Sequence, residues 1–258
     1  RKRNGCSPFQ PHFQGKSGRF FYCPRAARRP AIEPLLEWRH VGLKAGTTPI
    51  LSDFNLTVYP GEKVLLFGPS GTGKSTILKS FYGFFPVKSG DLLFKGKVLD
   101  KRAFWEVRKE VAYVPQNLDI GEGPVRPLVK AVFSYRGNTG TFDEQEMARL
   151  LEYFELGAGI FGKNFEDLSG GEKQRIGIVI SLLSDREIYF LDEITSSLDA
   201  DLKEKVITYY LTMESATELI ISHDPEWEGR DEVRIIRFDE HSRPPLAQEG
   251  PAEQKENP

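Results

Sequence analysis

The sequence predicts an α/β fold in which a mainly parallel β-sheet is covered by helices. Apolar runs typical of buried strands alternate along the chain with helix-like segments. One of these strands leads through a glycine-rich loop into a helix, and another ends in two adjacent acidic residues. The composition, with 39% hydrophobic and 28% charged residues, is that of an ordinary globular protein.

The first half of the expected domain contains three strands and a helix. Residues 35–41 and 54–58 alternate between apolar and polar side chains, as half-buried strands do. The turn at 60–61 leads into a continuous apolar run at 63–67, which is typical of a strand buried on both faces. A helix is expected to follow at 74–81.

The second half continues the alternation of strands and helices. No fixed-period repeat or heptad array is present, which disfavours solenoids and long coiled-coil ATPases. We expect strands at 111–114, 187–191, 218–221 and 232–238, and helices at 143–154, 171–183 and 202–213.

The two ends of the chain differ from the middle, so we expect one domain at 35–238 between two disordered tails. Residues 1–34 hold eight Lys or Arg residues against one Glu, whereas 239–258 are acidic. The net charge of −2 is therefore a cancellation, and the mildly acidic middle argues against nucleic-acid binding. Cys6 and Cys23 both lie in the first tail, where two free thiols are favoured over a bridge. No apolar run approaches the roughly 18 residues of a membrane span.

The strongest single feature is the loop Gly68-Pro-Ser-Gly-Thr-Gly-Lys-Ser75, which fits the phosphate-loop pattern in its expected strand–loop–helix context. Its glycines let backbone N–H groups converge on phosphate oxygens, and the helix N-terminus adds positive potential. Lys74 would neutralise the β- and γ-phosphates, and Ser75 would offer its hydroxyl to Mg²⁺. The expected nucleotide-binding residues are Gly68, Pro69, Ser70, Gly71, Thr72, Gly73, Lys74, Ser75 and Thr76.

Two adjacent acidic residues follow the apolar run at 188–191, and they help to distinguish among the kinds of protein that have a phosphate loop. Asp192 could hold Mg²⁺ through water, and Glu193 could orient or deprotonate an attacking water. A solvated acid pair at a strand end is the alternative. Because the pair follows a buried run in a chain that also has a phosphate loop, the sequence favours the catalytic interpretation.

A third motif, Leu168-Ser-Gly-Gly-Glu172, precedes an apolar helix, and by itself it could be a Ser-capped helix start. With the other motifs in order, residues 35–238 resemble the nucleotide-binding subunits of ABC transporters. The resemblance implies a P-loop NTPase fold with a RecA-like core, an antiparallel β subdomain and a helical subdomain at about 117–183. It also implies that Ser169, Gly170 and Gly171 contact a nucleotide held by another subunit.

The resemblance extends to three further motifs. Gln116 matches the Q-loop glutamine, which contacts Mg²⁺ and water, and 196–199 match the D-loop at the dimer interface. His223 matches the switch histidine that contacts the γ-phosphate. The family usually stacks adenine on an aromatic residue, but the best-matching position here is Leu43, or Ala45 in a shifted alignment. Neither can stack, so a strict preference for ATP over GTP is not implied.

The function that the resemblance implies is ATP hydrolysis coupled to transport, with ATP and Mg²⁺ bound between two copies of the chain. Glu193, His223, Lys74 and Gln116 would be the catalytic residues, and Ser75, Gln116 and Asp192 the metal-binding ones. An integral-membrane permease would hold the homodimer at the cytoplasmic face of the membrane.

The Asp-Glu-Ile-Thr sequence at 192–195 most resembles the FetA group, which is implicated in iron export. A soluble ABC-type ATPase module, for example in iron–sulfur cluster assembly, is the alternative; a kinase would leave the Ser-Gly-Gly motif unexplained.

Overall fold

The computed structural model describes residues 33–134 and 142–238. The chain divides into two compact units, Arg1–Ile32 and Glu33–Pro258, and every described residue belongs to the second. The expected tails, apart from residues 33 and 34, and both cysteines lie outside the described residues.

A parallel sheet forms the centre of the described chain, as the alternating pattern predicts. Its order is β6-β7-β8-β3-β9, and every neighbouring pair is parallel. The predicted strands at 63–67 and 111–114 match the structure, and the other three differ by one residue at each end. The strands are β3 (Lys63–Phe67), β6 (Val111–Val114), β7 (Ile188–Asp192), β8 (Thr217–Ser222) and β9 (Val233–Arg237).

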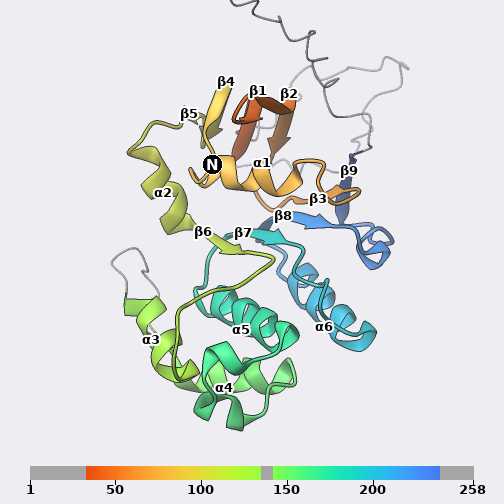
Figure 1. Cartoon of the computed structure of the whole chain (residues 1–258). Helices are drawn as coiled ribbons and strands as arrows, with labels where there is room; N and C mark the ends of the chain where they lie inside the picture. Colours follow the sequence, from red (N-terminus) through yellow and green to blue (C-terminus); the bar gives the residue numbers. More distant parts are fainter. Residues whose placement is uncertain (1–32, 135–141, 239–258) are drawn as a thin grey trace, which may run out of the picture. The chain divides into compact units, whose positions relative to one another are not determined.

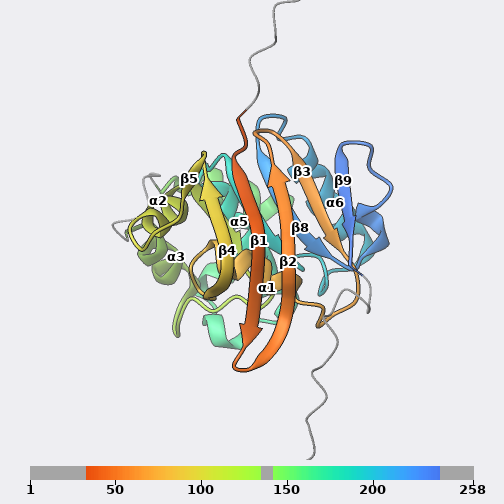
Figure 2. The same ribbon diagram turned by 90° about the horizontal axis from the view of Figure 1, so that it is seen from above.

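A second sheet is antiparallel and has the order β2-β1-β4-β5 (Figure 2). This confirms the antiparallel β subdomain that the family resemblance implies. The first two strands are longer than the sequence predicts, and the last two are not predicted at all. The strands are β1 (Leu36–Ala45), β2 (Thr48–Val58), β4 (Val87–Phe94) and β5 (Lys97–Val98).

Helices lie on both sides of the parallel sheet (Figure 1). One side carries α3, α4, α5 and α6, and the other carries α1 and the antiparallel sheet. Of these, α3, α4 and α5 fall in the range expected for the helical subdomain, whose boundaries stay a prediction. The helices are α1 (Lys74–Phe81), α2 (Ala103–Glu110), α3 (Val125–Ser134), α4 (Glu144–Tyr153), α5 (Gly170–Leu183) and α6 (Ala200–Leu211).

Two hydrophobic cores meet at the parallel sheet, because successive residues of a strand point to opposite faces. In β3, Leu65 packs into the core shared with α3–α6, whereas Val64 and Leu66 pack into the core shared with α1 and the antiparallel sheet. Both faces of β3 are therefore buried, which explains its continuous apolar run. The phosphate loop thus follows a strand that is fixed from both sides.

Among the described residues, none of the helices combines the length and apolar character that a bilayer crossing requires.

Candidate nucleotide site

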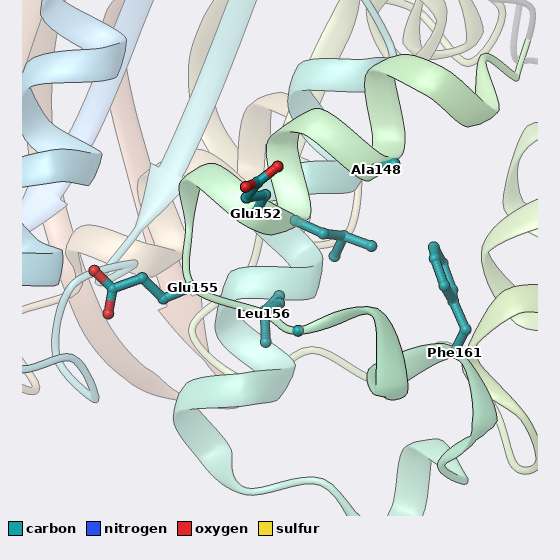
Figure 3. Close-up of a pocket in the computed structure, with 7 residues that line it drawn as sticks. Ala148, Glu152, Glu155, Leu156 and Phe161 are labelled. Atoms are coloured by element: carbon teal, nitrogen blue, oxygen red, sulfur yellow. The ribbon is translucent and has the colours of Figure 1, made fainter.

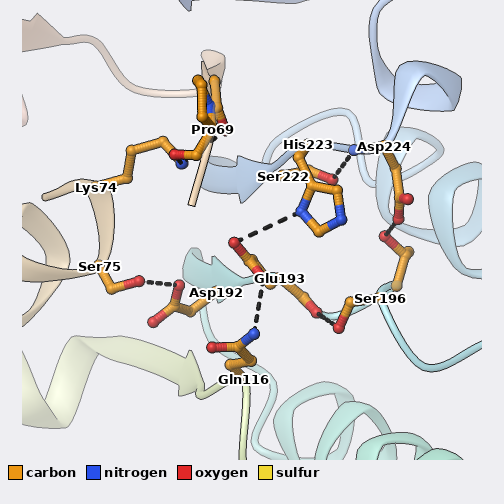
Figure 4. Close-up of polar contacts among 12 residues, drawn as sticks. Pro69, Lys74, Ser75, Gln116, Asp192, Glu193, Ser196, Ser222, His223 and Asp224 are labelled. Carbon is orange, nitrogen blue, oxygen red and sulfur yellow. Dashed lines mark hydrogen bonds and ion pairs between the residues drawn. The ribbon is translucent and has the colours of Figure 1, made fainter. Parts of the chain in front are cut away.

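The residues that the motifs single out gather where four neighbouring strands end. The phosphate loop follows β3, Gln116 lies just beyond β6, Asp192 is the last residue of β7, and His223 follows β8. Because these strands are adjacent and parallel, their carboxyl ends meet at one edge of the sheet. Figure 4 shows the side chains of Lys74, Ser75, Gln116 and the strand-end residues facing a common space.

The phosphate loop needs glycine at its two ends. Gly68 has a φ of 152°, and a Cβ there would lie 2.3 Å from the carbonyl oxygen of Phe238. Gly73 has a φ of 96°, and its Cβ would lie 2.6 Å from Cγ2 of Ile50. A side chain at either position would therefore displace the loop backbone. No described side chain caps α1, and its first turn contains no acidic residue, so its N-terminus is suited to an anion.

Lys74 lies inside the loop that it closes. Its Nζ donates to the carbonyl oxygens of Gly68 (2.8 Å) and Pro69 (2.6 Å). Burial lowers the pKa of Lys74, an effect that the nearby carboxylates of Glu193 and Asp192 partly oppose. The loop thus holds a partly desolvated ammonium group beside the helix N-terminus, which is an arrangement suited to phosphate.

Asp192 joins the phosphate loop to the neighbouring strands. Its Oδ1 accepts a hydrogen bond from Ser75 Oγ (2.7 Å), and its Oδ2 accepts one from Tyr113 Oη (3.1 Å). Burial and the charge of Asp192 raise the pKa of Tyr113, so this hydroxyl stays protonated and donates. Both oxygens of the Asp192 carboxylate are therefore oriented by hydroxyl groups.

Magnesium fits the donor set at this point. The Ser75 hydroxyl and the Asp192 carboxylate place two hard oxygen atoms 2.7 Å apart beside the phosphate loop. Mg²⁺ is typically held by one or two such groups together with phosphate oxygens. In the part of the chain that the structure describes, no three His, Cys, Asp or Glu side chains form a metal site of their own.

Glu193 lies between the Gln116 and His223 side chains. Gln116 Nε2 donates to Glu193 Oε2 (2.7 Å), and His223 Nδ1 lies 3.6 Å from Glu193 Oε1 (Figure 4). The Glu193 backbone has a φ of 50° and its N–H donates to the carbonyl of Ile221 in β8. Ser196 Oγ donates to the Glu193 carbonyl oxygen (2.9 Å). The carboxylate is therefore held by its own turn and by the two motif residues beside it.

The Ser-Gly-Gly motif begins α5 on the helical side of the sheet. Ser169 Oγ accepts from the N–H of Glu172, and the Glu172 carboxylate accepts from the N–H of Ser169. This capping box bears out the helix-start interpretation. A Cβ on Gly170 would meet no atom within 4 Å, so the backbone is open at this point. None of the hydrogen bonds given above for the strand-end residues involves this segment.

The expected base contact at Leu43 is wrong. Leu43 is 0% exposed and packs in the core beneath the antiparallel sheet. The pairing of β1 shifts register between Trp38 and Val41 and again on both sides of Leu43, and His40 has a φ of 52°. These bulges turn Leu43 inward. Ala45, the alternative in the shifted alignment, is exposed at the end of β1.

Four residues near the site were not predicted from the sequence: Tyr113, Thr195, Lys203 and Asp224. Thr195 and Asp224 are buried and hydrogen-bond to each other (2.5 Å), and Lys203 also bonds to Asp224 (2.7 Å). A signal was available, because Thr195 and Asp224 stand beside motif residues at strand ends. Their partners lie far apart in the sequence, so their contacts could not be anticipated.

A pocket between α4 and the 3₁₀ turn Ala158–Gly162 lies apart from these strand ends (Figure 3). None of the predicted site residues contributes to it, so we assign it no part in nucleotide chemistry. Its lining is Ala148, Leu151, Glu152, Glu155, Leu156, Gly157 and Phe161.

The family described as ABC transporter matches residues 51–196, more than half of the chain. The chain belongs to the ABC transporter family. Its fold is that of an ABC ATPase domain, and ATP hydrolysis is the activity that membership assigns to it.

Two curated ABC relatives are similar over much of their own length. The "probable iron export ATP-binding protein FetA" of Escherichia coli K12 is 35% identical, over 81% of this chain and 93% of that protein. The "zinc transport system ATP-binding protein TroB" of Treponema pallidum is 32% identical, over 68% of this chain and 67% of that protein.

Solved ABC structures have the same fold. A dimeric post-hydrolysis state of an ATP-binding cassette with ADP and Pi has a TM-score of 0.66 at 25% identity, over 79% of this chain and 94% of that one. A bacterial Atm1-family ABC exporter with ATP bound has a TM-score of 0.69 at 22% identity. The similarity to the exporter covers 84% of this chain but only 38% of the exporter chain.

Proposed function

We propose that this chain is the ATP-hydrolysing subunit of an ABC transporter and that two copies close head to tail around two MgATP. The observation that carries the proposal is the meeting of Lys74, Asp192, Glu193 and His223 at the ends of adjacent strands. These residues supply a phosphate ligand, a metal ligand, a base and a group that contacts the γ-phosphate, all within one edge of the sheet.

Nucleotide binding is an exchange of partners at the phosphate loop. Lys74 Nζ donates to two carbonyl oxygens of its own loop, and phosphate oxygens would replace them. Ser75 and Asp192 would hold Mg²⁺, which neutralises charge on the phosphates when bound. Leu43 is buried and so is not proposed as a base contact.

Glu193 is the proposed general base. Its Oε1 lies 3.6 Å from His223 Nδ1 and its Oε2 accepts from Gln116 Nε2, so the carboxylate stands between two other motif residues at the strand ends. A water held by Glu193 and Gln116 would attack the γ-phosphate, with its proton passing to Glu193. His223 would contact the γ-phosphate oxygens and thereby keep the group in line.

The head-to-tail dimer accounts for the separate place of the Ser-Gly-Gly motif. The first turn of α5 is open at Gly170, and its N-terminus favours an anion. We infer that Ser169–Gly171 of one copy contact the γ-phosphate held by the other. The similar cassette solved as a dimer supports this arrangement. Hydrolysis would then remove the charge that joins the two copies.

A transporter role rests on the relatives and the family. The proteins FetA and TroB are an iron-export and a zinc-transport ATP-binding protein by name, and this chain covers at least two thirds of each. We propose that an integral-membrane permease holds the dimer at the cytoplasmic face of the membrane, with metal export, of iron in particular, as the first cargo to test.

Glu193→Gln tests the catalytic proposal. The variant keeps the shape of the side chain but removes the base, so we expect MgATP binding to remain and turnover to fall at least about 100-fold. Two copies should then stay closed, and gel filtration in MgATP should show a dimer. Glu187→Gln is the matched control, because it makes the same change at an exposed residue at the other end of β7.

Two further results decide the proposal. Lys74→Ala should weaken MgATP binding itself and so prevent the dimer. A Glu193→Gln variant that remains monomeric and hydrolyses ATP normally would refute both the base and the dimer. Co-purification of the wild-type chain with a soluble partner in place of a membrane protein would favour the assembly-module alternative.

A further inference from the structure

A buried carboxylate stands next to the exposed switch histidine. The His223 side chain is 48% exposed, whereas its neighbours Ser222 and Asp224 are 2% and 6% exposed. The Asp224 N–H donates to Ser222 Oγ (2.9 Å), which closes a tight turn around the histidine. The position of His223 is therefore set mainly by its two buried neighbours.

Asp224 also joins three segments that are far apart in the sequence. Its Oδ2 accepts from Thr195 Oγ1 (2.5 Å), in the turn after β7, and its Oδ1 accepts from Lys203 Nζ (2.7 Å), in α6. The Trp227 indole N–H also donates to Thr195 Oγ1 (3.4 Å). Figure 4 shows Asp224 and His223 on neighbouring parts of one loop, with the Glu193 turn facing them.

The Thr195 end of this network lies two residues after Glu193. Thr195 is 0% exposed, and its hydroxyl fixes the same turn in which Ser196 binds the Glu193 carbonyl. The turn that carries Glu193 and the turn that carries His223 are thus joined through one carboxylate. The Glu193 N–H, which donates to Ile221 in β8, is a second link between them.

Charge compensation lets the carboxylate stay ionised inside the protein. Burial raises the pKa of Asp224, but the hydrogen bonds from Lys203 and Thr195 outweigh it and hold the pKa below its ordinary value. An ionised carboxylate that accepts two hydrogen bonds holds its donors firmly in place, because each of these hydrogen bonds is charge-assisted.

We propose that Asp224 is a positioning residue that, through Thr195 and Lys203, holds Glu193 and His223 at their working separation. This inference rests on the catalytic roles proposed above for those two residues. The two carboxylate oxygens of Asp224 accept from Thr195 and Lys203, and neither of these hydrogen bonds involves the phosphate loop. It acts on ATP hydrolysis by fixing the turns on both sides of the site.

Thr195→Val and Thr195→Ser form the first test. Valine keeps the shape of threonine but cannot donate to Asp224, whereas serine can. We expect Thr195→Val to lower kcat for ATP hydrolysis by about 10- to 100-fold with KM for MgATP within about twofold, because a small displacement costs rate rather than binding. Thr195→Ser should restore kcat. Combining Thr195→Val with Asp224→Asn should cost less than the sum of the two single losses, since both changes weaken the Thr195–Asp224 contact while Asp224→Asn also weakens the pair with Lys203.

The Lys63–Glu218 pair supplies a matched structural control. It is a more deeply buried ion pair (3.0 Å) between Lys63, the first residue of β3, and Glu218, the second residue of β8, at the end of the sheet opposite the site. Glu218→Gln removes the charge of a buried carboxylate away from the site and should leave kcat unchanged. Circular dichroism at the assay temperature confirms that each variant is folded.

The outcomes separate this inference from the proposed function. A Thr195→Val variant with wild-type kcat, or one whose loss Glu218→Gln reproduces, overturns the positioning role. If Glu193→Gln abolishes turnover in the same assays, the proposed function still stands. If the Glu193→Gln variant hydrolyses ATP as fast as the wild type, the proposed function is overturned instead.

Discussion

At the scale of single residues, the site is built by hydroxyl groups and amides that orient charged side chains. Lys74 is held by carbonyl oxygens, Asp192 by Ser75 and Tyr113, and Glu193 by Gln116. Asp192 and Glu193 therefore have their carboxylates oriented by neighbouring donors, and such preorganisation contributes to stabilising a transition state, whereas Lys74 would exchange its carbonyl partners for phosphate oxygens.

Tyr113→Phe tests this orientation at Asp192. The change removes one hydroxyl from a residue that stacks on Tyr82, and it leaves Asp192 Oδ2 without that donor. We expect the affinity for ATP in the presence of Mg²⁺ to fall about fivefold, which corresponds to the roughly 1 kcal/mol of one hydrogen bond. Calorimetric titration in Mg²⁺ and in EDTA measures it.

The affinity of this variant for ATP in EDTA should match that of the wild type. Tyr82→Phe is the control, because Tyr82 donates to the carbonyl of Val111 and not to the site. Equal losses in Mg²⁺ and in EDTA would mean that Tyr113 supports the loop and not the metal ligand.

The residues that sequence could locate are those whose chemistry depends on local spacing. Gly68, Lys74 and Asp192 stand at fixed distances from a strand end, so a short motif finds them. The predicted base contact at Leu43 was wrong because register shifts in β1 leave its side chain on the buried face of the strand. Asp224 was missed because its hydrogen-bond partners come from α6 and from the turn after β7. Bulges and long-range pairs leave no mark in a local pattern.

At the scale of elements, the strands and helices predicted well are those with strong patterns of their own. β3, α1 and β6 match their predicted bounds. β4 was missed because its first half is mostly exposed and polar and includes Gly90. This segment is a strand because it pairs with β1. In α3, Pro127 reads as a helix breaker, although the first turn tolerates it.

Ser169→Ala tests whether the start of α5 serves more than the helix. Loss of the cap should reduce the free energy of unfolding by about 1 kcal/mol, measured by urea denaturation. If Ser169 also contacts the partner's nucleotide, the MgATP-dependent dimer of the Glu193→Gln background should be lost as well.

Glu172→Gln is the control for this element. Hydrogen bonds from Lys163 and from the Ser169 N–H lower the pKa of Glu172 to about 2, so its charge is part of the capping box. Its removal should destabilise α5 similarly but keep the dimer. A dimer that survives Ser169→Ala would limit Ser169 to its capping role.

At the scale of the whole described domain, the parallel sheet carries chemistry at its carboxyl edge and a buried ion pair near its amino edge. Glu218 is fully buried, bonds to Lys63, and leaves Oε2 with no partner among the described residues. Burial raises its pKa to about 7, although Lys63 opposes the shift. The folded state therefore binds this proton more tightly than the unfolded chain does.

Stability should consequently fall as pH rises from about 4.5 to about 7, because the contribution of Glu218 is complete below its unfolded pKa and is lost through its folded one. The loss attributable to this residue is roughly 3 kcal/mol, at about 1.4 kcal/mol per pKa unit. Glu218→Gln should remove that dependence. Urea denaturation at pH 5, 6 and 7 measures it, and a slope that Glu218→Gln leaves intact would contradict the assignment.

The sheet also separates two cores, and this has a consequence for how substitutions combine. Leu65 and Leu66 are adjacent in the chain, yet their side chains pack into different cores and share no core partners. Leu65 and Ile220 are remote in sequence but are paired neighbours in one core. Truncations at Leu65 and Leu66 should therefore act additively, whereas those at Leu65 and Ile220 should be coupled. In this domain, the stability effects of two substitutions are coupled when the side chains pack on the same face of the sheet, whatever their separation along the chain.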